Sequence, residues 1–416
     1  MAADDELDPA VAPPRMDASW TPRAHRPPVE GEEVDEPGER HATNLELFLD
    51  LVFVFAITQI AALIAHDPTG RGYLRGLLVT WLVWWQWSQF TWAGSAIDLQ
   101  KVRRTRVFVL CIIPVALLNA VAIPHVFDDA PDAAARWFAG TYFGVLLLVL
   151  AVQGLEARKV PETWTAFVRY MSVVVIAPVV VLVGSFVHGT PRAVVWSVAV
   201  LINVIGALRA ASAGEWSVDP VHFAERHALF IIISLGEVLV SAGLTASDAG
   251  LTAHTVEGLV AGVSVACVMW WIYFAYIPEV TEHRLRIAEG GERGRYARDV
   301  FTFGHFPLVA GIVSYAVVTK HLVAHPDGHL SAHDRWMLGL AVLMFLGGLM
   351  LQQFVIIRRV APERVVALVV CLGAAAAGRW IPALVLVPGV AVVLGVMQAV
   401  TLRRMRGRLR SQRRPA

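Results

Sequence analysis

Charged residues and cysteines are both scarce in this chain of 416 residues. Only 17% of the residues are charged and 56% are hydrophobic, whereas about a quarter of the residues in a soluble domain are charged. This composition excludes an ordinary soluble protein. The three cysteines, Cys111, Cys267 and Cys371, each lie inside an apolar run, so no disulfide framework, zinc motif or redox pair is predicted. We expect all three to be buried as small apolar residues.

Residues 1–38 lack the apolar core of a signal peptide. They are acidic and rich in proline, which predicts a disordered cytoplasmic N-terminal tail rather than a cleavable leader. Residues 403–416 are strongly basic and predict a cytoplasmic C-terminal tail. That tail serves as an orientation anchor in our interpretation, with contact to anionic lipid as the alternative.

Recognisable catalytic motifs are absent as well. The sequence contains no phosphate-binding glycine loop, Walker motif, zinc-protease helix or serine nucleophile elbow. We therefore predict no catalytic residue, cofactor, metal site or nucleic-acid partner. Four histidines do recur at every fourth residue, but Pro326 and Gly328 interrupt any helix there, so a solvated loop is favoured over a metal or proton-sensing site. These histidines are His321, His325, His329 and His333.

Long apolar runs fill the rest of the chain. A membrane helix needs about 20 apolar residues to cross about 30 Å of hydrocarbon, and twelve runs are candidates, the last two being short spans pressed together near Arg379. The fold is thus predicted to be all-α, a polytopic membrane protein. The predicted spans are 44–65, 72–97, 106–127, 135–155, 164–187, 192–208, 222–244, 255–277, 300–323, 335–357, 364–377 and 380–402.

Lysine and arginine are concentrated in every second predicted loop. Basic loops follow spans two, four, eight and ten, whereas the loop after span seven has neither residue. Because cytoplasmic loops carry the excess of positive residues, this alternation places both termini in the cytoplasm. The predicted location is a plasma (inner) membrane.

Two short motifs recur at one spacing along the chain. The sequence Glu-Arg-His-Ala at 39–42 recurs at 225–228, and Trp84-Trp85 recurs as Trp270-Trp271, both 186 residues later. Further matches follow at spacings of 199 to 201 residues. Each half would contain six spans, so the halves share one orientation and are predicted to be parallel repeats. The predicted units are 39–210, the first six-helix repeat, and 211–402, the second.

Acidic residues inside the predicted spans are rare, and each costs about 3 kcal/mol to insert. Glu46 and Asp50 share one face of span one, and Glu237 lies about 16 Å along span seven from Arg226. In the repeat register Asp50 matches Gly236, so the two deepest acids are neighbours rather than equivalents. A structural pair with an arginine, a histidine or a tryptophan N–H is one explanation of these acids, and a permeation site is the other.

Three segments carry a family resemblance. Residues 45–56 (LELFLDLVFVFA), 225–230 (ERHALF) and 235–237 (LGE) are similar to motifs of the bacterial low temperature requirement A (LtrA) family. The resemblance covers roughly residues 40–402 and implies a multi-pass inner-membrane protein whose molecular activity is not established. The motif residues that it marks here are Arg40, His41, Glu46, Asp50, Glu225, Arg226, His227, Gly236 and Glu237.

These patterns favour passage of an ion or small solute, with Glu46, Asp50 and Glu237 along the pathway. An intramembrane enzyme or lipid-handling protein that uses Glu237 and His227 as acid and base is the alternative, and a non-transporting scaffold is a third. Membrane lipid and the solute are the expected partners, and a homo-oligomer is a further candidate partner. The predicted supporting polar residues are Arg40, His41, Glu225, Arg226, His227 and Gly236.

Overall fold

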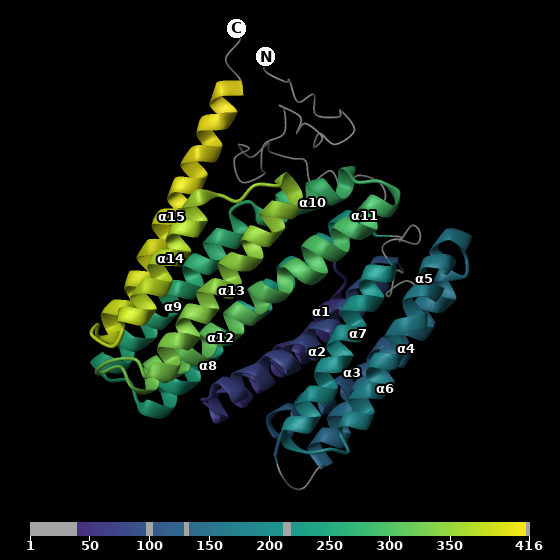
Figure 1. The fold of residues 1–416 in the computed structure, drawn as a ribbon, viewed down its shortest axis with the longest axis horizontal. Coiled ribbons are helices and arrows are strands. Elements are labelled where there is room, and N and C mark those ends of the chain that lie inside the picture. Colours follow the sequence, from purple (N-terminus) through teal and green to yellow (C-terminus); the bar gives the residue numbers. More distant parts are fainter. Residues whose placement is uncertain (1–39, 97–102, 129–132, 211–217, 413–416) are drawn as a thin grey trace, which may run out of the picture.

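The computed structural model describes residues 40–96, 103–128, 133–210 and 218–412 (Figure 1). All regular structure in these ranges is helical, which confirms the predicted all-α class. The predicted tail at 1–38 lies outside the described residues. The last helix continues through most of the predicted basic tail, to Gln412.

The helices divide by position in the chain. The first half contains α1 (Asn44–His66), α2 (Gly70–Ala96), α3 (Arg103–Ala122), the 3-10 turn η2 (Ile123–His125), α4 (Ala133–Ala157), α5 (Pro161–Val174), α6 (Ile176–Gly184) and α7 (Gly189–Ala210). The second half contains α8 (Pro220–Ala249), α9 (Ala253–Phe274), α10 (Ile277–Ile287), α11 (Gly290–Tyr296), the π-helix η3 (Ala297–Phe303), α12 (Gly304–Ala324), α13 (Ala332–Ile357), α14 (Pro362–Ala377) and α15 (Ala383–Gln412).

Ten helical segments within the described residues are long and apolar enough to cross a membrane. The two predicted spans outside this set are α2 and α14. Helix α14 has 16 residues, and α2 has 27 residues but carries many polar ones. The polar side chains of α2, among them Gln86, Ser88 and Gln89, are buried against other helices and so need not be apolar.

Helix α2 runs back along the whole of α1. Arg40, just before α1, donates to the carbonyl of Ser95 near the end of α2. At the opposite end, a Cβ on Gly72 would collide with Asp67, which directly follows α1. A helix that begins beside the end of α1 and ends beside its start covers the same depth as α1.

Two predicted spans are interrupted by proline. The predicted span at 164–187 is divided into α5 and α6, and the predicted span at 255–277 ends with a break between α9 and α10. Pro178 and Pro278 lie one turn beyond the respective breaks. A proline ring clashes with the carbonyl four residues earlier and provides no N–H, which explains both breaks.

Large apolar side chains cover the outside of the bundle. On α14, for example, Val366 and Val369 are 62% and 63% exposed. Such a surface is expected where lipid rather than water surrounds the helices. The expected burial of all three cysteines is wrong: Cys371 is buried, but Cys111 and Cys267 are exposed on this apolar exterior.

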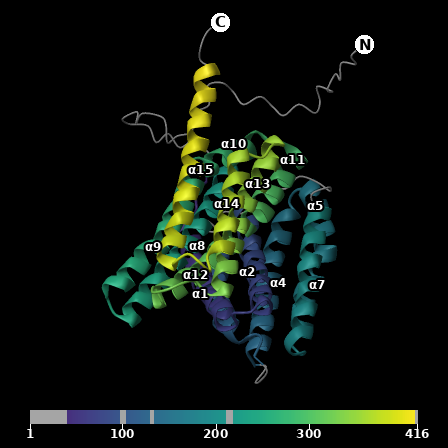
Figure 2. The same ribbon diagram turned by 60° about the vertical axis from the view of Figure 1, so that its left-hand side comes forward.

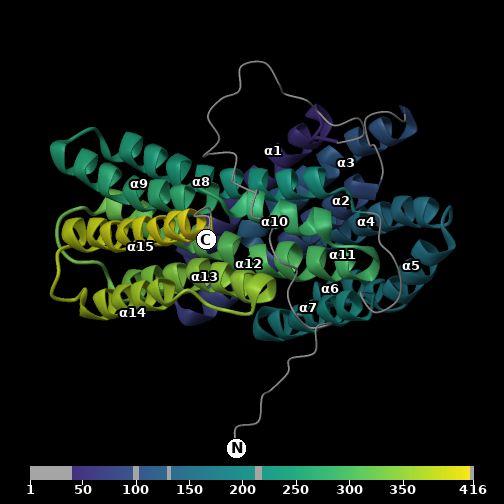
Figure 3. The same cartoon turned by 90° about the horizontal axis from the view of Figure 1, so that it is seen from above.

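The helices form two groups with α1 and α2 between them (Figure 1). Helices α3–α7 lie on one side, and α8, α9 and α12–α15 lie on the other, an arrangement that the turned view also shows (Figure 2). Seen from above, α9, α14 and α15 occupy one end of the long axis and α4–α7 the other (Figure 3). Helix α1 packs on α2 and α3 and also on α8 and α12, so it joins the two groups.

The same helix pairings occur in both groups. In the first half, α1 packs on α2 and α3, α3 on α4, α4 on α5 and α6, α6 on α7, and α2 on α7. In the second half, α8 packs on α9 and α12, α12 on α13, α13 on α14, α14 on α15, and α9 on α15. The environments nevertheless differ: Trp84 on α2 is buried, whereas Trp270 on α9 is 51% exposed.

Candidate functional site

The beginnings of α1 and α8 meet at one end of the bundle. Thr43 and Glu46 cap α1 reciprocally: the Thr43 hydroxyl accepts from the Glu46 N–H (3.3 Å), and Glu46 Oε2 accepts from the Thr43 N–H (2.9 Å). Asp219 is the N-cap of α8 and accepts from the His222 N–H. Capping therefore fixes where both helices begin.

Four acid–base pairs connect α1 and its leading residues to α8. Two lie toward the surface: Arg40 with Asp219 at 3.2 Å, and His41 with Glu225 at 3.3 Å. Deeper, Glu46 Oε1 lies 2.9 Å from His222 Nε2, with both side chains buried. Deepest is the pair between Asp50 and Arg226. We call these four pairs the α1–α8 charge ladder; each pairs residues 176 to 184 positions apart in the chain.

The Asp50 carboxylate accepts three hydrogen bonds. Arg226 Nη1 donates to Asp50 Oδ2 (2.6 Å) and Nη2 donates to Oδ1 (3.0 Å), which is the two-pronged geometry that guanidinium and carboxylate favour. Trp87 Nε1 of α2 donates a third bond to Oδ1 (3.0 Å). Asp50, Arg226 and Trp87 are at most 2% exposed. The arrangement is a desolvated ion pair with a neutral donor that locks three helices together.

Glu237 lies further along the same interface but has partners of another kind. It is 1% exposed and accepts hydrogen bonds from the hydroxyl groups of Thr58 on α1 and Ser241 on α8. No ion pair to Glu237 forms among the described residues. The Lys320 ammonium, exposed on α12, acts on it only through space. Glu237 is thus a shielded carboxylate with hydroxyl partners alone.

Helices α1 and α8 run in the same direction past each other. Asp50 meets Arg226 near their starts, and Thr58 meets Glu237 about two turns further along α1 and about three turns further along α8. The structure therefore brings Glu46, Asp50 and Glu237 onto one interface between α1 and α8. Their role in passage of a solute stays a prediction.

His227 has a different set of partners from Glu237. Its Nδ1 lies 2.8 Å from the Phe223 carbonyl, and its Nε2 has no hydrogen-bond partner among the described residues. Its ring packs between Trp87 of α2 and Phe301 of η3, with centroids 5.1 Å away in each case. No described contact joins His227 to Glu237, so the acid and base that an intramembrane enzyme would need are not brought together.

Gly236 contributes neither charge nor close packing. A Cβ added there would meet nothing within 4 Å, unlike the glycines at tight helix crossings. At Gly311, for comparison, an added Cβ would lie 2.7 Å from the Ala341 carbonyl oxygen. The motif glycine is therefore not explained by helix contact.

A second buried polar cluster was missed from the sequence. Trp84 Nε1 donates to the Thr302 carbonyl (2.9 Å), and Trp92 Nε1 donates to the Thr302 hydroxyl (3.0 Å). Nearby, the Tyr273 hydroxyl lies 2.8 Å from His305 Nε2. Thr302 belongs to η3, a π-helix, and such segments are frequent at functional sites.

One sequence signal could have indicated this distortion. Pro307 lies inside α12, and its ring disfavours the normal helical bond to the carbonyl of Phe303, the last residue of η3. The proline predicts a disturbed turn at this depth but not which side chains fill it.

The described residues contain no group of three or more histidine, cysteine, aspartate or glutamate side chains placed to hold a metal ion. Of the four histidines at fourth-residue spacing, His321 lies 2.5 Å from Asp334 across the loop between α12 and α13. His329 and His325 lie in that loop, where Gly328 adopts a positive φ of 108°. The break that proline and glycine predicted in a histidine-bearing helix is present.

Comparison with known proteins identifies a family for this chain but no relative with a described activity. The chain is 28% identical over 293 residues to the uncharacterized protein RA0937 of Rhizobium meliloti (strain 1021), covering 68% of this chain and 69% of that protein. No solved structure matches it significantly. The model of the bacterial low temperature requirement A protein family matches residues 41–399. This match includes the charge ladder from His41 onward and Glu237, and the chain belongs to the bacterial low temperature requirement A (LtrA) family.

Proposed function

We propose that this chain conducts a proton or a small cation across the plasma membrane along the interface of α1 and α8. The observation that carries the proposal is Glu237, a buried carboxylate near the middle of α8 that has hydroxyl partners and no base. A carboxylate at this depth is costly unless it is paired or serves a purpose. Glu237 is the binding group of the proposed pathway.

The charge ladder forms the closed end of the pathway in this proposal. Arg226 donates to both oxygens of Asp50, so its guanidinium charge already neutralises the carboxylate that a passing cation would need. Opening requires the guanidinium to leave the carboxylate, which would expose a second acid about two turns from Glu237. The outer pairs at Arg40 and His41 hold the starts of α1 and α8 while this happens.

Two parallel six-helix repeats provide the frame for this arrangement. The recurring helix pairings and the common direction of α1 and α8 support repeats at 39–210 and 211–402. In parallel repeats the first helices of the two halves lie across a pseudo-twofold axis. A pathway along that axis would pass the α1–α8 interface.

Proton flux in reconstituted vesicles tests the proposal. Glu237→Gln retains a side chain that can bond both hydroxyls but removes the titratable group, so we expect flux to fall to that of protein-free vesicles. Glu257→Gln, on the exposed beginning of α9, is the matched control and should leave flux unchanged. The flux is followed with an internal pH dye, and sodium and potassium gradients are imposed in separate runs.

Three results would contradict the proposal. Wild-type protein that gives no flux of protons, sodium or potassium above empty vesicles is not a conductor. If the Glu237→Gln variant conducts like wild type, Glu237 is not part of the pathway. A variant that is inactive and also melts at a lower temperature than Glu257→Gln would assign Glu237 a structural role instead.

Membrane orientation is tested independently by cysteine labelling. Lys159 follows α4 and is exposed, and Asp327 follows α12 and is exposed. In a background with the three native cysteines replaced by alanine, a membrane-impermeant maleimide on intact cells should label Asp327→Cys and not Lys159→Cys. Labelling of both from outside would overturn the proposed cytoplasmic termini.

A further inference from the structure

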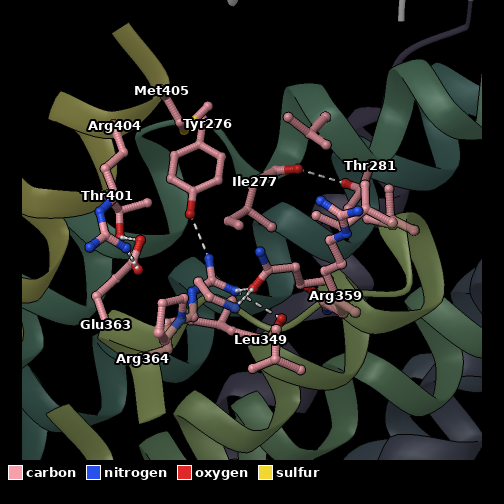
Figure 4. A pocket seen from close by; sticks show the side chains of 18 residues that line it. Tyr276, Ile277, Thr281, Leu349, Arg359, Glu363, Arg364, Thr401, Arg404 and Met405 are labelled. Atoms are coloured by element: carbon pink, nitrogen blue, oxygen red, sulfur yellow. Dashed lines mark hydrogen bonds and ion pairs between the residues drawn. The ribbon is translucent and has the colours of Figure 1, made fainter. Parts of the chain in front are cut away.

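A cavity of about 430 Å³ lies in the second half, away from the α1–α8 interface (Figure 4). It is formed where α9 gives way to α10, where α13 ends, where α14 begins, and along the last turns of α15. Its volume falls within the range of small-molecule sites. In the proposed orientation this end of the helices faces the cytoplasm.

Three arginines and one acid line the cavity. Arg404 pairs with Glu363 at 2.5 Å. Arg364 is buried and donates to the Leu349 carbonyl (3.0 Å) and the Tyr276 hydroxyl (2.5 Å) rather than to a carboxylate. Its neutral partners orient the guanidinium without neutralising it.

Arg359 is the third arginine and the least constrained. It is exposed and has no hydrogen bond or ion pair to any described residue. Figure 4 shows it on the Thr281 side of the cavity, with Arg364 at the centre and Arg404 on the other side. The lining thus carries an excess of positive charge, because a single carboxylate, that of Glu363, faces three guanidinium groups.

The remaining lining is largely apolar. Ile277 and Val280 come from α10, Ile356 and Ile357 from the end of α13, and Met405 from α15. Beside the cavity, α14 presents exposed valines to the surroundings of the bundle. A site with guanidinium groups and apolar walls at the edge of the hydrocarbon suits an anion attached to an apolar chain, whereas free phosphate would gain nothing from those walls.

We propose that this cavity binds the phosphate-bearing headgroup of an anionic phospholipid from the cytoplasmic leaflet. Arg359 and Arg364 bind the phosphate oxygens by charge-assisted hydrogen bonds. The apolar residues of α10 and α13 contact the glycerol and the upper part of the acyl chains. This site does not depend on the proposed pathway at Glu237, and either can stand without the other.

The first half offers a matched control. Arg158 follows α4 as Arg359 follows α13, with the 201-residue spacing of the predicted repeat, and it also lies at the predicted cytoplasmic end. Its guanidinium instead stacks over the Trp164 ring, 5.0 Å from the centroid. Arg158→Gln therefore removes an equivalent surface charge without touching the cavity.

Native mass spectrometry of the purified full-length protein in detergent tests the site. Three probes are titrated: phosphatidylglycerol, phosphatidylcholine and inorganic phosphate. We expect wild-type protein to retain one phosphatidylglycerol in preference to phosphatidylcholine. Arg359→Gln should weaken that binding about tenfold, the loss of one charge-assisted hydrogen bond, and Arg158→Gln should leave it unchanged.

Each other outcome overturns the assignment. Equal retention of phosphatidylcholine would show that the anionic charge is not recognised. Inorganic phosphate that binds with the same dependence on Arg359 while phosphatidylglycerol does not would assign the site to a soluble anion. An equal loss of phosphatidylglycerol binding in Arg158→Gln would show that the effect comes from surface charge in general and not from the cavity. Arg404→Gln, which frees Glu363 to compete for the remaining arginines, should weaken phosphatidylglycerol binding as well, and unchanged binding there would also count against the site.

Discussion

Asp50 and Glu237 are buried on the same interface between α1 and α8, yet their surroundings differ in kind. Asp50 accepts two bonds from Arg226 and one from Trp87, whereas Glu237 accepts only from the hydroxyls of Thr58 and Ser241. The first carboxylate is neutralised where it lies, and the second is solvated by neutral donors. Burial alone therefore does not identify a functional acid. A charged partner indicates a structural ion pair, whereas neutral partners leave the carboxylate available to bind a cation.

Because their partners differ in charge, Asp50 and Glu237 should also differ in how much a substitution lowers stability. A buried pair that loses one partner leaves an uncompensated charge, which costs far more than the intact pair contributes. A hydroxyl-bonded carboxylate can be replaced by an amide of the same shape with most of its hydrogen bonds retained. The two acids should thus respond oppositely to conservative substitution.

The largest effect is expected at Arg226. Arg226→Gln strands the Asp50 carboxylate among apolar helices and should lower the free energy of unfolding by about 3 to 5 kcal/mol. Thermal unfolding in detergent micelles measures it. The double variant Arg226→Leu with Asp50→Leu removes both charges and should recover most of the loss. A single variant as stable as wild type would mean that Asp50 is not locked, and the contrast with Glu237 would fail.

A smaller effect is expected at Trp87. Trp87→Phe keeps the ring against Phe230 and His227 but removes the N–H that reaches Asp50 Oδ1. The loss should be about 1 to 2 kcal/mol, between the average for membrane hydrogen bonds and the value for bonds to a charged group. Trp85→Phe is the matched control, because the Trp85 N–H has no partner among the described residues. Equal losses in both variants would assign the effect to packing.

Much of this architecture was accessible from the sequence because few physical rules govern it. The length of the apolar runs predicted the helices, since a bilayer fixes how long a crossing helix must be. Ionisable residues are rare inside membrane helices because the hydrocarbon makes them costly, and this rarity drew attention to Asp50 and Glu237. The proline positions would have predicted the breaks at Pro178 and Pro278, which a count of apolar residues alone overlooks.

The partners of those residues could not be predicted in the same way. Which base meets Asp50 depends on the axial offset of α1 against α8, and nothing in either helix alone fixes that offset. Trp87 and Thr58 were not distinguished from neighbouring tryptophans and threonines, because helical periodicity does not tell a face toward lipid from a face toward another helix. The outward cysteines on α3 and α9 were missed for this reason too.

The smallest effect on stability is expected at Gly236, the residue before Glu237 and the one that the predicted repeat register aligns with Asp50. Glycine inside a helix is normally less stable than alanine by up to about 1 kcal/mol, and an added Cβ at Gly236 meets nothing within 4 Å. Gly236→Ala should therefore leave the free energy of unfolding unchanged or raise it slightly. At Gly311 the same substitution places Cβ 2.7 Å from the Ala341 carbonyl oxygen and 2.8 Å from the Phe345 nitrogen, so α12 and α13 must separate and stability should fall.

Flux measured on both glycine variants turns this stability contrast into a functional one. If Gly236→Ala is as stable as wild type but conducts less, the glycine keeps space open beside Glu237, and the Glu237 region differs from the Asp50 region by access as well as by charge. If Gly236→Ala is destabilised as much as Gly311→Ala, a helix approaches Gly236 closely. The surroundings of Glu237 would then be packed as closely as those of Asp50, and only the charge of their partners would distinguish the two acids.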